Sequence, residues 1–231
     1  MKKKIILKSS ILAVAAGLSV FAINSVFADE LPVQFMGVND FHGALEQTGT
    51  ARLEGETVKN AGTAPLLATY LNDSQKDFET ENAGTPNASI RVQAGDMVGA
   101  SPANSALLQD EPTVKVFNEM NFEYGTLGNH EFDEGLGEFN RIMKGEAPTP
   151  GQFNKIVDEY PHEASKQEVV IANLVDKDTN KIPFDWKPYT IKEIPVNDKT
   201  VKVGFIGVVT TEFPNLVLRK NHEQYRVLDE A

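Results

Sequence analysis

Short apolar segments alternate along this chain with longer segments of helical periodicity, and this order narrows the choice of folds more than any other feature. Strands are predicted at 33–39, 89–94, 122–127 and 168–175, and helices at 65–78, 112–120 and 133–143. Strands that alternate with helices are typical of an α/β fold, in which helices pack on the faces of a sheet. In such sheets, functional residues collect at the carboxyl ends of the strands.

Four further segments complete this outline. Residues 45–62 are polar and rich in glycine, and residues 144–167 contain three prolines, so both segments are predicted to be irregular. The apolar segments 190–195 and 200–209 flank the turn residues Asn197-Asp198. Two apolar segments around such a turn predict a β-hairpin.

Composition excludes several classes of protein. The chain has 231 residues, no cysteine and a net charge of −11. Its length fits one domain, or one domain and part of another. Without cysteine, the chain has neither disulfides, nor thiolate metal sites, nor a cysteine nucleophile. The acidic balance argues against binding in a nucleic-acid groove, because proteins that do so carry clustered Lys and Arg.

Residues 1–28 have the pattern of a secretory signal peptide. Four lysines and an apolar run at 11–23 precede Val26-Phe27-Ala28, which places small residues at positions −3 and −1 before Asp29. The alternative is an uncleaved membrane anchor, although the run is short for a bilayer. Cleavage removes four lysines and no acidic residue, which takes the net charge from −11 to −15. We expect the mature protein to lie outside or on the surface of a bacterial cell, without a membrane segment.

Polar residues directly follow the first two predicted strands. Asp40 and His42 come after strand 33–39, and side chains two residues apart in an extended segment share a face, so this pair can bind one cation. Gly95-Asp96 follows strand 89–94, and the two oxygens of a carboxylate can bridge two cations. Taken singly, each cluster has a plainer interpretation, since an isolated Asp more often caps a turn or a helix.

A third polar cluster, Gly128-Asn129-His130-Glu131, follows strand 122–127. The amide of Asn129 is a neutral ligand, which would leave a pair of cations with more positive charge than a carboxylate would. His130 and Asp133 lie three residues apart, so Asp133 can hold one ring nitrogen and favour the charged histidine. The alternative is a turn asparagine beside a surface histidine. Three such clusters at successive strand ends are hard to explain by chance.

These clusters resemble the first three sequence blocks of the calcineurin-like metallophosphoesterases. The matching segments are V-N-D-F-H-G at 38–43, Q-A-G-D-M-V-G at 93–99 and G-N-H-E-F-D-E-G at 128–135. The chain is more similar to their secreted bacterial 5′-nucleotidase branch, which includes 2′,3′-cyclic-nucleotide phosphodiesterases and enzymes anchored to Gram-positive cell walls. The resemblance covers most of residues 33–230 and implies an α/β metallophosphoesterase core of β-sheet layers flanked by helices.

The resemblance also implies a role for each matching residue. The implied metal ligands are Asp40, His42, Asp96 and Asn129, with Asp96 between two divalent cations. The implied catalytic dyad is His130 with Asp133, supported by hydrogen bonds of Glu131. Ligands of this kind suit Zn, Mn, Co or Fe. The implied reaction is hydrolysis of nucleotide phosphate esters by metal-activated water, of the 5′-nucleotidase type and also on 2′,3′-cyclic nucleotides.

The family pattern is incomplete in this sequence. The later blocks that supply further histidine ligands are absent, and neither His162 nor His222 lies in a matching context. We therefore expect residues 29–231 to be the N-terminal part of a longer enzyme, whose remainder completes the site, binds the nucleoside and attaches the protein to the cell wall. Alone, this part is expected to turn over little or no substrate. The alternative is a non-catalytic surface-binding or adhesion protein that retains the fold.

Overall fold

The computed structural model of this chain describes residues 31–229. The signal peptide predicted at residues 1–28 lies outside the described residues, as do the last two residues of the chain, so the boundary at residue 28 stays a prediction. Within the described part, no helix has the length and apolar character needed to cross a membrane.

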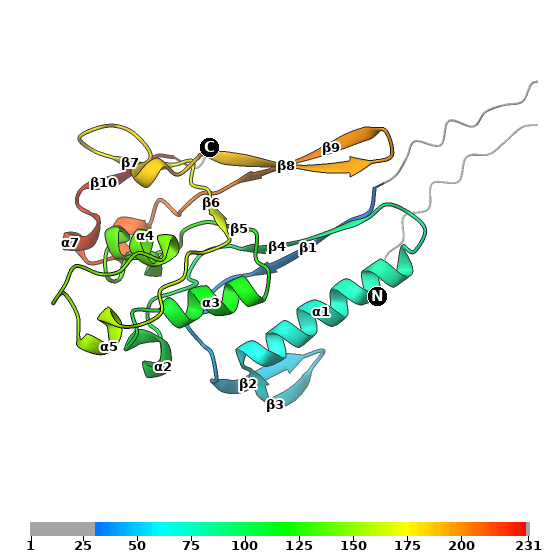
Figure 1. Cartoon of the computed structure of the whole chain (residues 1–231), viewed down its shortest axis with the longest axis horizontal. Coiled ribbons are helices and arrows are strands. Elements are labelled where there is room, and N and C mark those ends of the chain that lie inside the picture. The colour runs from blue at the N-terminus through cyan, green and yellow to red at the C-terminus, as the bar shows by residue number, and fades with distance from the viewer. Residues whose placement is uncertain (1–30, 230–231) are drawn as a thin grey trace, which may run out of the picture. The chain divides into compact units, whose positions relative to one another are not determined.

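A parallel sheet of four strands underlies the fold (Figure 1). Its strands are β1 (Val33–Val38), β4 (Ala88–Gln93), β5 (Tyr124–Gly125) and β6 (Glu168–Val169), in the order β1-β4-β5-β6. β1 and β4 pair from Val33 opposite Ala88 to Val38 opposite Gln93, so their carboxyl ends are level. The sheet and the helices between its strands confirm the predicted α/β fold.

Helices occupy most of the connections between the strands. The described ones, with η for 3-10 helices, are α1 (Ala64–Glu81), α2 (Ala103–Ala106), α3 (Glu111–Glu119), η1 (His130–Phe132), α4 (Leu136–Lys144), α5 (Lys155–Asp158), η2 (Pro183–Asp185), α6 (Phe213–Leu216) and α7 (Arg219–His222). α1 begins where the Thr63 hydroxyl accepts the Leu66 N–H, with a proline in its first turn. The helix predicted at 133–143 begins only at Leu136, because Gly135, between η1 and α4, has a φ of 86°.

Three antiparallel pairs complete the fold. They are β2 (Thr48–Leu53) with β3 (Glu56–Gly62), β7 (Leu174–Asp176) with β10 (Tyr225–Val227), and β8 (Tyr189–Val196) with β9 (Lys199–Ile206). The β8–β9 pair confirms the hairpin predicted around Asn197-Asp198. The prediction that residues 45–62 are irregular is wrong. Nearly all residues of β3 are exposed, so its sequence has no alternation of apolar residues that would predict a strand. Glu54-Gly55, with φ values of 51° and 90°, forms the two-residue turn between β2 and β3.

Helices and the β8–β9 hairpin cover opposite faces of the sheet. On one face of β4, the Arg91 guanidinium donates hydrogen bonds to side chains of α1 and to the carbonyl of Met120, which follows α3. The neighbouring Ile90 points to the other face, because side chains alternate along a strand. There it packs against Ile194 and Val196 of β8.

Two predicted strands are shorter than the apolar runs that suggest them. Only two residues of segment 122–127 pair in β5, and segment 168–175 divides between β6 and β7. Phe122, Leu127, Ile171 and Leu174 are nevertheless at most 2% exposed. Their apolar character therefore reflects packing in the core, which stabilises the fold by roughly 1.5–3 kcal/mol for each such side chain.

Candidate metal centre

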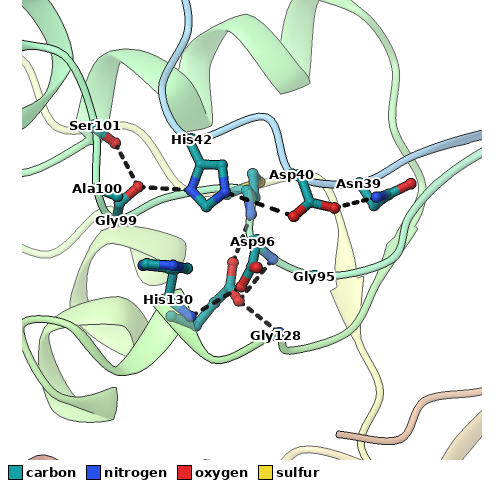
Figure 2. Close-up of polar contacts among 12 residues, drawn as sticks. Asn39, Asp40, His42, Gly95, Asp96, Gly99, Ala100, Ser101, Gly128 and His130 are labelled. Atoms are coloured by element: carbon teal, nitrogen blue, oxygen red, sulfur yellow. Dashed lines mark hydrogen bonds and ion pairs between the residues drawn. The ribbon is translucent and has the colours of Figure 1, made fainter. Parts of the chain in front are cut away.

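Three loops at the carboxyl ends of β1, β4 and β5 meet at one place (Figure 2). The Asp40 N–H donates to the Gly95 carbonyl at 3.2 Å, and the His42 N–H donates to the Asp96 carbonyl at 3.1 Å. The loop after β5 joins them through the backbone N–H of His130, which donates to Asp96 Oδ1 at 2.9 Å. The structure therefore brings residues of all three polar clusters together.

The backbone of these loops is strained at the polar residues. Asp40, His42 and Asp96 have φ values of 53°, 48° and 53°. This left-handed region is unfavourable for residues with a side chain, although Asp and His occur there more often than most. Each such position costs on the order of 1–3 kcal/mol, and residues of this kind cluster at functional sites.

Side-chain atoms suited to metal binding lie close together in this centre. One nitrogen or oxygen atom from each of His42, Asp96 and His130 lies within 4.8 Å of the others. Asp40 adjoins them, with Oδ1 3.7 Å from His42 Nε2, while its other oxygen accepts a hydrogen bond from Asn39. Imidazole nitrogen and carboxylate oxygen are ligands of divalent transition metals. The donor types and their spacing fit a metal ion, and geometry alone admits His130 as one of the ligands.

The hydrogen bond of His42 determines which of its ring nitrogens is available. Nδ1 lies 2.9 Å from the carbonyl oxygen of Gly99, and a carbonyl can only accept a hydrogen bond, so Nδ1 carries the proton. In the neutral ring, Nε2 then has the free lone pair, and Nε2 is the nitrogen on the side of Asp40. A metal-binding histidine is commonly held in this way, with its other nitrogen bonded to a carbonyl or carboxylate.

His130 and Asp133 form a hydrogen-bonded pair, as their spacing predicts. His130 Nδ1 lies 2.8 Å from Asp133 Oδ2, and the same oxygen accepts the Ala100 N–H at 3.0 Å. Burial lowers the pKa of His130, but the hydrogen bond to Asp133 and the negative charges of Asp133, Asp96 and Glu131 outweigh it, so the pKa is raised overall. Nε2 is the ring nitrogen left to bind a metal or a substrate.

Glu131 holds two of the three loops from within the core. Its side chain is buried, and its carboxylate accepts the backbone N–H groups of Asp96 (3.0 Å), Met97 (2.7 Å) and Gly128 (2.6 Å). Burial raises the pKa of Glu131 to about 7, although these three N–H donors oppose the shift. These hydrogen bonds agree with the supporting role that the sequence resemblance implies for Glu131.

The remaining predicted ligand is Asn129, whereas His162 and His222 are not expected in the site. Asn129 precedes η1 directly, between Gly128 and His130, and its side chain does not cap that helix. His162 instead pairs with Glu111, at 2.6 Å, and the His222 ring packs edge-on against Phe213. Sequence reasoning does not find the contribution of α7, where the Asn221 side chain donates to the Asp133 carbonyl at 2.7 Å. No local sequence pattern predicts this hydrogen bond, because 88 residues separate the two partners.

Several curated proteins are similar to this chain in sequence, although no family model matches it. The cell wall protein Lmo0130 of Listeria monocytogenes is 53% identical over 205 residues, covering 88% of this chain and 25% of that protein. The endonuclease YhcR of Bacillus subtilis is 36% identical, covering 88% and 15%. A 2′,3′-cyclic-nucleotide 2′-phosphodiesterase/3′-nucleotidase of Salmonella typhimurium is 32% identical, covering 52% and 17%. The chain thus spans a quarter or less of the length of each of these relatives.

Solved structures share the fold. The NAD nucleotidase of Haemophilus influenzae superposes with a TM-score of 0.58 at 23% identity, covering 85% of this chain and 29% of that one. The calcineurin-like phosphoesterase YfkN of Bacillus subtilis superposes with a TM-score of 0.56 at 23% identity, covering 85% and 54%. Fold and strand-end loops together are those of a metallophosphoesterase. The chain has the fold of the calcineurin-like phosphoesterases, and its sequence is similar to that of a bacterial 2′,3′-cyclic-nucleotide 2′-phosphodiesterase/3′-nucleotidase.

Proposed function

We propose that this chain is the N-terminal part of a secreted enzyme that hydrolyses phosphate esters of nucleotides with two divalent cations. The observation that carries the proposal is the meeting of His42, Asp96 and His130 at three strand ends, beside Asp40 and Asp133. The names of relatives support nucleotides as the substrate class, since one is a cyclic-nucleotide phosphodiesterase and a structural neighbour is an NAD nucleotidase.

Four side chains of this chain would hold the cations. Asp40 and His42 would hold the first, Asp96 would lie between the two, and Asn129 would hold the second. Oxygen and nitrogen donors without sulfur suit Zn, Mn, Co or Fe. When bound, such a pair of cations neutralises phosphoryl oxygens and lowers the pKa of water toward about 7. Asn129, as a neutral amide, leaves the centre more positive than a carboxylate would, which favours an anionic substrate in a chain of net charge −11.

His130 and Asp133 would act on the ester oxygen that leaves. Asp133 holds Nδ1 of His130, so the ring is oriented and Nε2 can present a proton to that oxygen. A charged imidazole at this place also stabilises the negative charge that builds up as the bond to phosphorus breaks. The backbone N–H of Ala100 fixes the Asp133 carboxylate in turn.

The test is hydrolysis of AMP and of 2′,3′-cyclic AMP by the complete protein, with Mn²⁺ or Zn²⁺ added. His130→Ala is expected to lose most of the turnover. His222→Ala removes a histidine that packs on Phe213 outside the centre, and it is expected to keep the wild-type rate. Equal rates in these two variants would remove His130 from the mechanism, and wild-type protein that hydrolyses neither nucleotide would refute the proposed activity.

A second function, that of a non-catalytic wall or surface-binding protein, is favoured by the 53% identical relative that is named a cell wall protein. It predicts that the protein binds metal without hydrolysing either nucleotide. Under both functions we propose that residues 1–28 direct export and that a further C-terminal part attaches the protein to the wall. Fractionation of cells should then find the protein, without residues 1–28, in the wall fraction.

A further inference from the structure

The loop of Gly99 and Ala100 contacts His42 directly and reaches His130 through its partner Asp133. The Gly99 carbonyl accepts His42 Nδ1–H, and the Ala100 N–H donates to the Asp133 oxygen that also bonds His130. A Cβ added to Gly99, whose φ is 78°, would lie 2.4 Å from the His130 carbonyl oxygen. The position of this loop therefore decides how both imidazoles are held.

Asp110 fixes this loop from outside the centre. Its Oδ2 accepts the Gly99 N–H at 3.1 Å, and its Oδ1 accepts the Ser105 hydroxyl at 2.6 Å. Ser105 and Thr113 are fully buried, and their hydroxyls pair at 2.8 Å. Asp110, Gly99 and Ala100 line one wall of a cavity of about 100 Å³ that His130 and Asp133 line as well. A chain of hydrogen bonds thus runs from the buried Ser105 through the half-buried Asp110 to Gly99.

The local structure of Asp110 conflicts with its position at a helix start. Asp110 is the N-cap residue of α3, where an Asp side chain normally accepts a backbone N–H of the first turn, but it makes no such bond. It also has a left-handed φ of 59°, directly after Gln109 with 55°. Residues that break a local rule in this way are expected at functional positions. The helix gives up its cap, and the carboxylate holds the Gly99 loop instead.

We propose that Asp110 is a positioning residue of the metal centre: through Gly99 it keeps His42 protonated on Nδ1, so that Nε2 is free for a cation. The metal ligation of His42 rests on the proposed function, whereas the protonation of its ring nitrogens does not. A residue with a merely structural role would change the stability of the protein and leave the His42 ring as it is.

The test compares Asp110→Gly with Gln109→Gly in the complete protein. Glycine accepts the left-handed conformation at both positions, so both variants are expected to fold. In protein labelled with ¹⁵N-histidine and free of metal, the neutral His42 ring should show protonated Nδ1 in wild type and in Gln109→Gly. Asp110→Gly should show a mixture of both tautomers. Its affinity for Mn²⁺, by calorimetry, should fall about 10-fold or more, as expected for loss of a group that orients a ligand.

Two further variants keep the proposal testable. Asp110→Asn retains an oxygen for the Gly99 N–H, so it should keep the wild-type tautomer and affinity within about 3-fold. Ser105→Ala removes one hydrogen bond of Asp110, together with the bond to Thr113, but keeps the Asp110 carboxylate. It should shift the His42 tautomer in the same direction but less. An unchanged tautomer in both Asp110→Gly and Ser105→Ala would overturn the proposal. Wild-type protein that holds the tautomer but hydrolyses no nucleotide would refute the proposed function alone.

Discussion

Two histidine–carboxylate pairs in this fold have nearly the same geometry but different surroundings. His130 Nδ1 lies 2.8 Å from Asp133, and His162 Nδ1 lies 2.6 Å from Glu111. The side chains of the first pair are 30% and 37% exposed, and those of the second pair are 13% and 4% exposed. Distance alone therefore does not distinguish a pair that can perform chemistry from one that only supports the fold.

The groups around each pair make the difference. Glu111 also accepts from Arg141, which binds Glu138 as well, and His162 Nε2 is buried without a hydrogen-bond partner among the described residues. Around His130, by contrast, other side chains suited to metal binding lie close together, and the ring is partly open to solvent. The second pair joins the irregular segment 144–167 to α3, while the first pair faces the proposed cations.

We expect the largest effect, on the free energy of unfolding, when the arginine that binds Glu111 of the buried pair is replaced. Arg141→Met leaves the carboxylates of Glu111 and Glu138, which are 4% and 9% exposed, without their cation. Breaking a buried ion pair by removing one partner costs about 3–5 kcal/mol of unfolding free energy. Urea unfolding measures the loss. Lys155→Met is the control, because its ion pair with Glu159 is exposed and contributes at most about 1 kcal/mol. An equal, small loss in both variants would contradict the account of this pair.

Exchanging carboxylate for amide in each pair should separate their functions. Asp133→Asn removes the charge that holds His130 and should lower kcat on the order of 10²-fold, as for loss of an oriented acid. Glu111→Gln should leave kcat of the folded protein within about 3-fold of wild type. Initial rates of AMP hydrolysis, normalised to folded protein, decide between the pairs. Similar losses of kcat in both variants would show that the His130–Asp133 pair has no role in the reaction that the His162–Glu111 pair lacks.

We expect a smaller loss of stability when the hydrogen bonds between Glu131 and the loops are weakened. In Glu131→Gln, one oxygen can replace Oε2, but the amide NH₂ then faces the Met97 N–H, and an unmade buried hydrogen bond costs about 1–3 kcal/mol. Thermal unfolding should show this loss, and Mn²⁺ affinity should fall with it. Glu134→Gln, at an exposed neighbouring position, is the matched control. Wild-type stability and affinity in Glu131→Gln would exclude Glu131 as a support.

The smallest effect belongs to an exposed ion pair far from either histidine. The hydrogen bond from Lys187 lowers the pKa of Glu168 below its ordinary 4.5. A lowered carboxyl pKa stabilises the fold above the ordinary value, and this contribution disappears as the pH falls through the folded value. Glu168→Gln should therefore flatten the decrease in Tm below pH 4.5 by a contribution under about 1 kcal/mol. A decrease in Tm that is as steep in the variant would exclude the pair as its source.

The sequence predicts most of the fold because local patterns specify it. Helical spacing and a first-turn proline mark α1, and the turn Asn197-Asp198 marks the β8–β9 hairpin. The β2–β3 hairpin is not predicted, because almost all residues of β3 are exposed and its sequence therefore lacks alternating apolar residues. Strands β5 and β6 are shorter than predicted because apolar residues around them fill the core without pairing in a sheet.

The sequence also places the main polar residues of the centre, but not the groups that hold them. Asp40, Asp96 and His130 each follow a predicted strand, and parallel strands bring their carboxyl ends to one edge. The bond between Asp110 and Gly99 and the bond between Asn221 and Asp133 depend on how distant loops pack. The left-handed backbone of Asp40 and Asp96 likewise depends on tertiary contacts, so the residue types alone do not predict it.

Anomalous diffraction from crystals of the complete protein soaked in Mn²⁺ would show whether the three strand-end loops hold a pair of cations. We expect two peaks in the anomalous map, one in contact with Asp40, His42 and Asp96, and a second in contact with Asp96 and Asn129. Crystals of Asp96→Asn, which lacks the bridging carboxylate, should lose at least one of these peaks. Manganese bound only elsewhere on the protein, or two unchanged peaks in Asp96→Asn, would contradict the account.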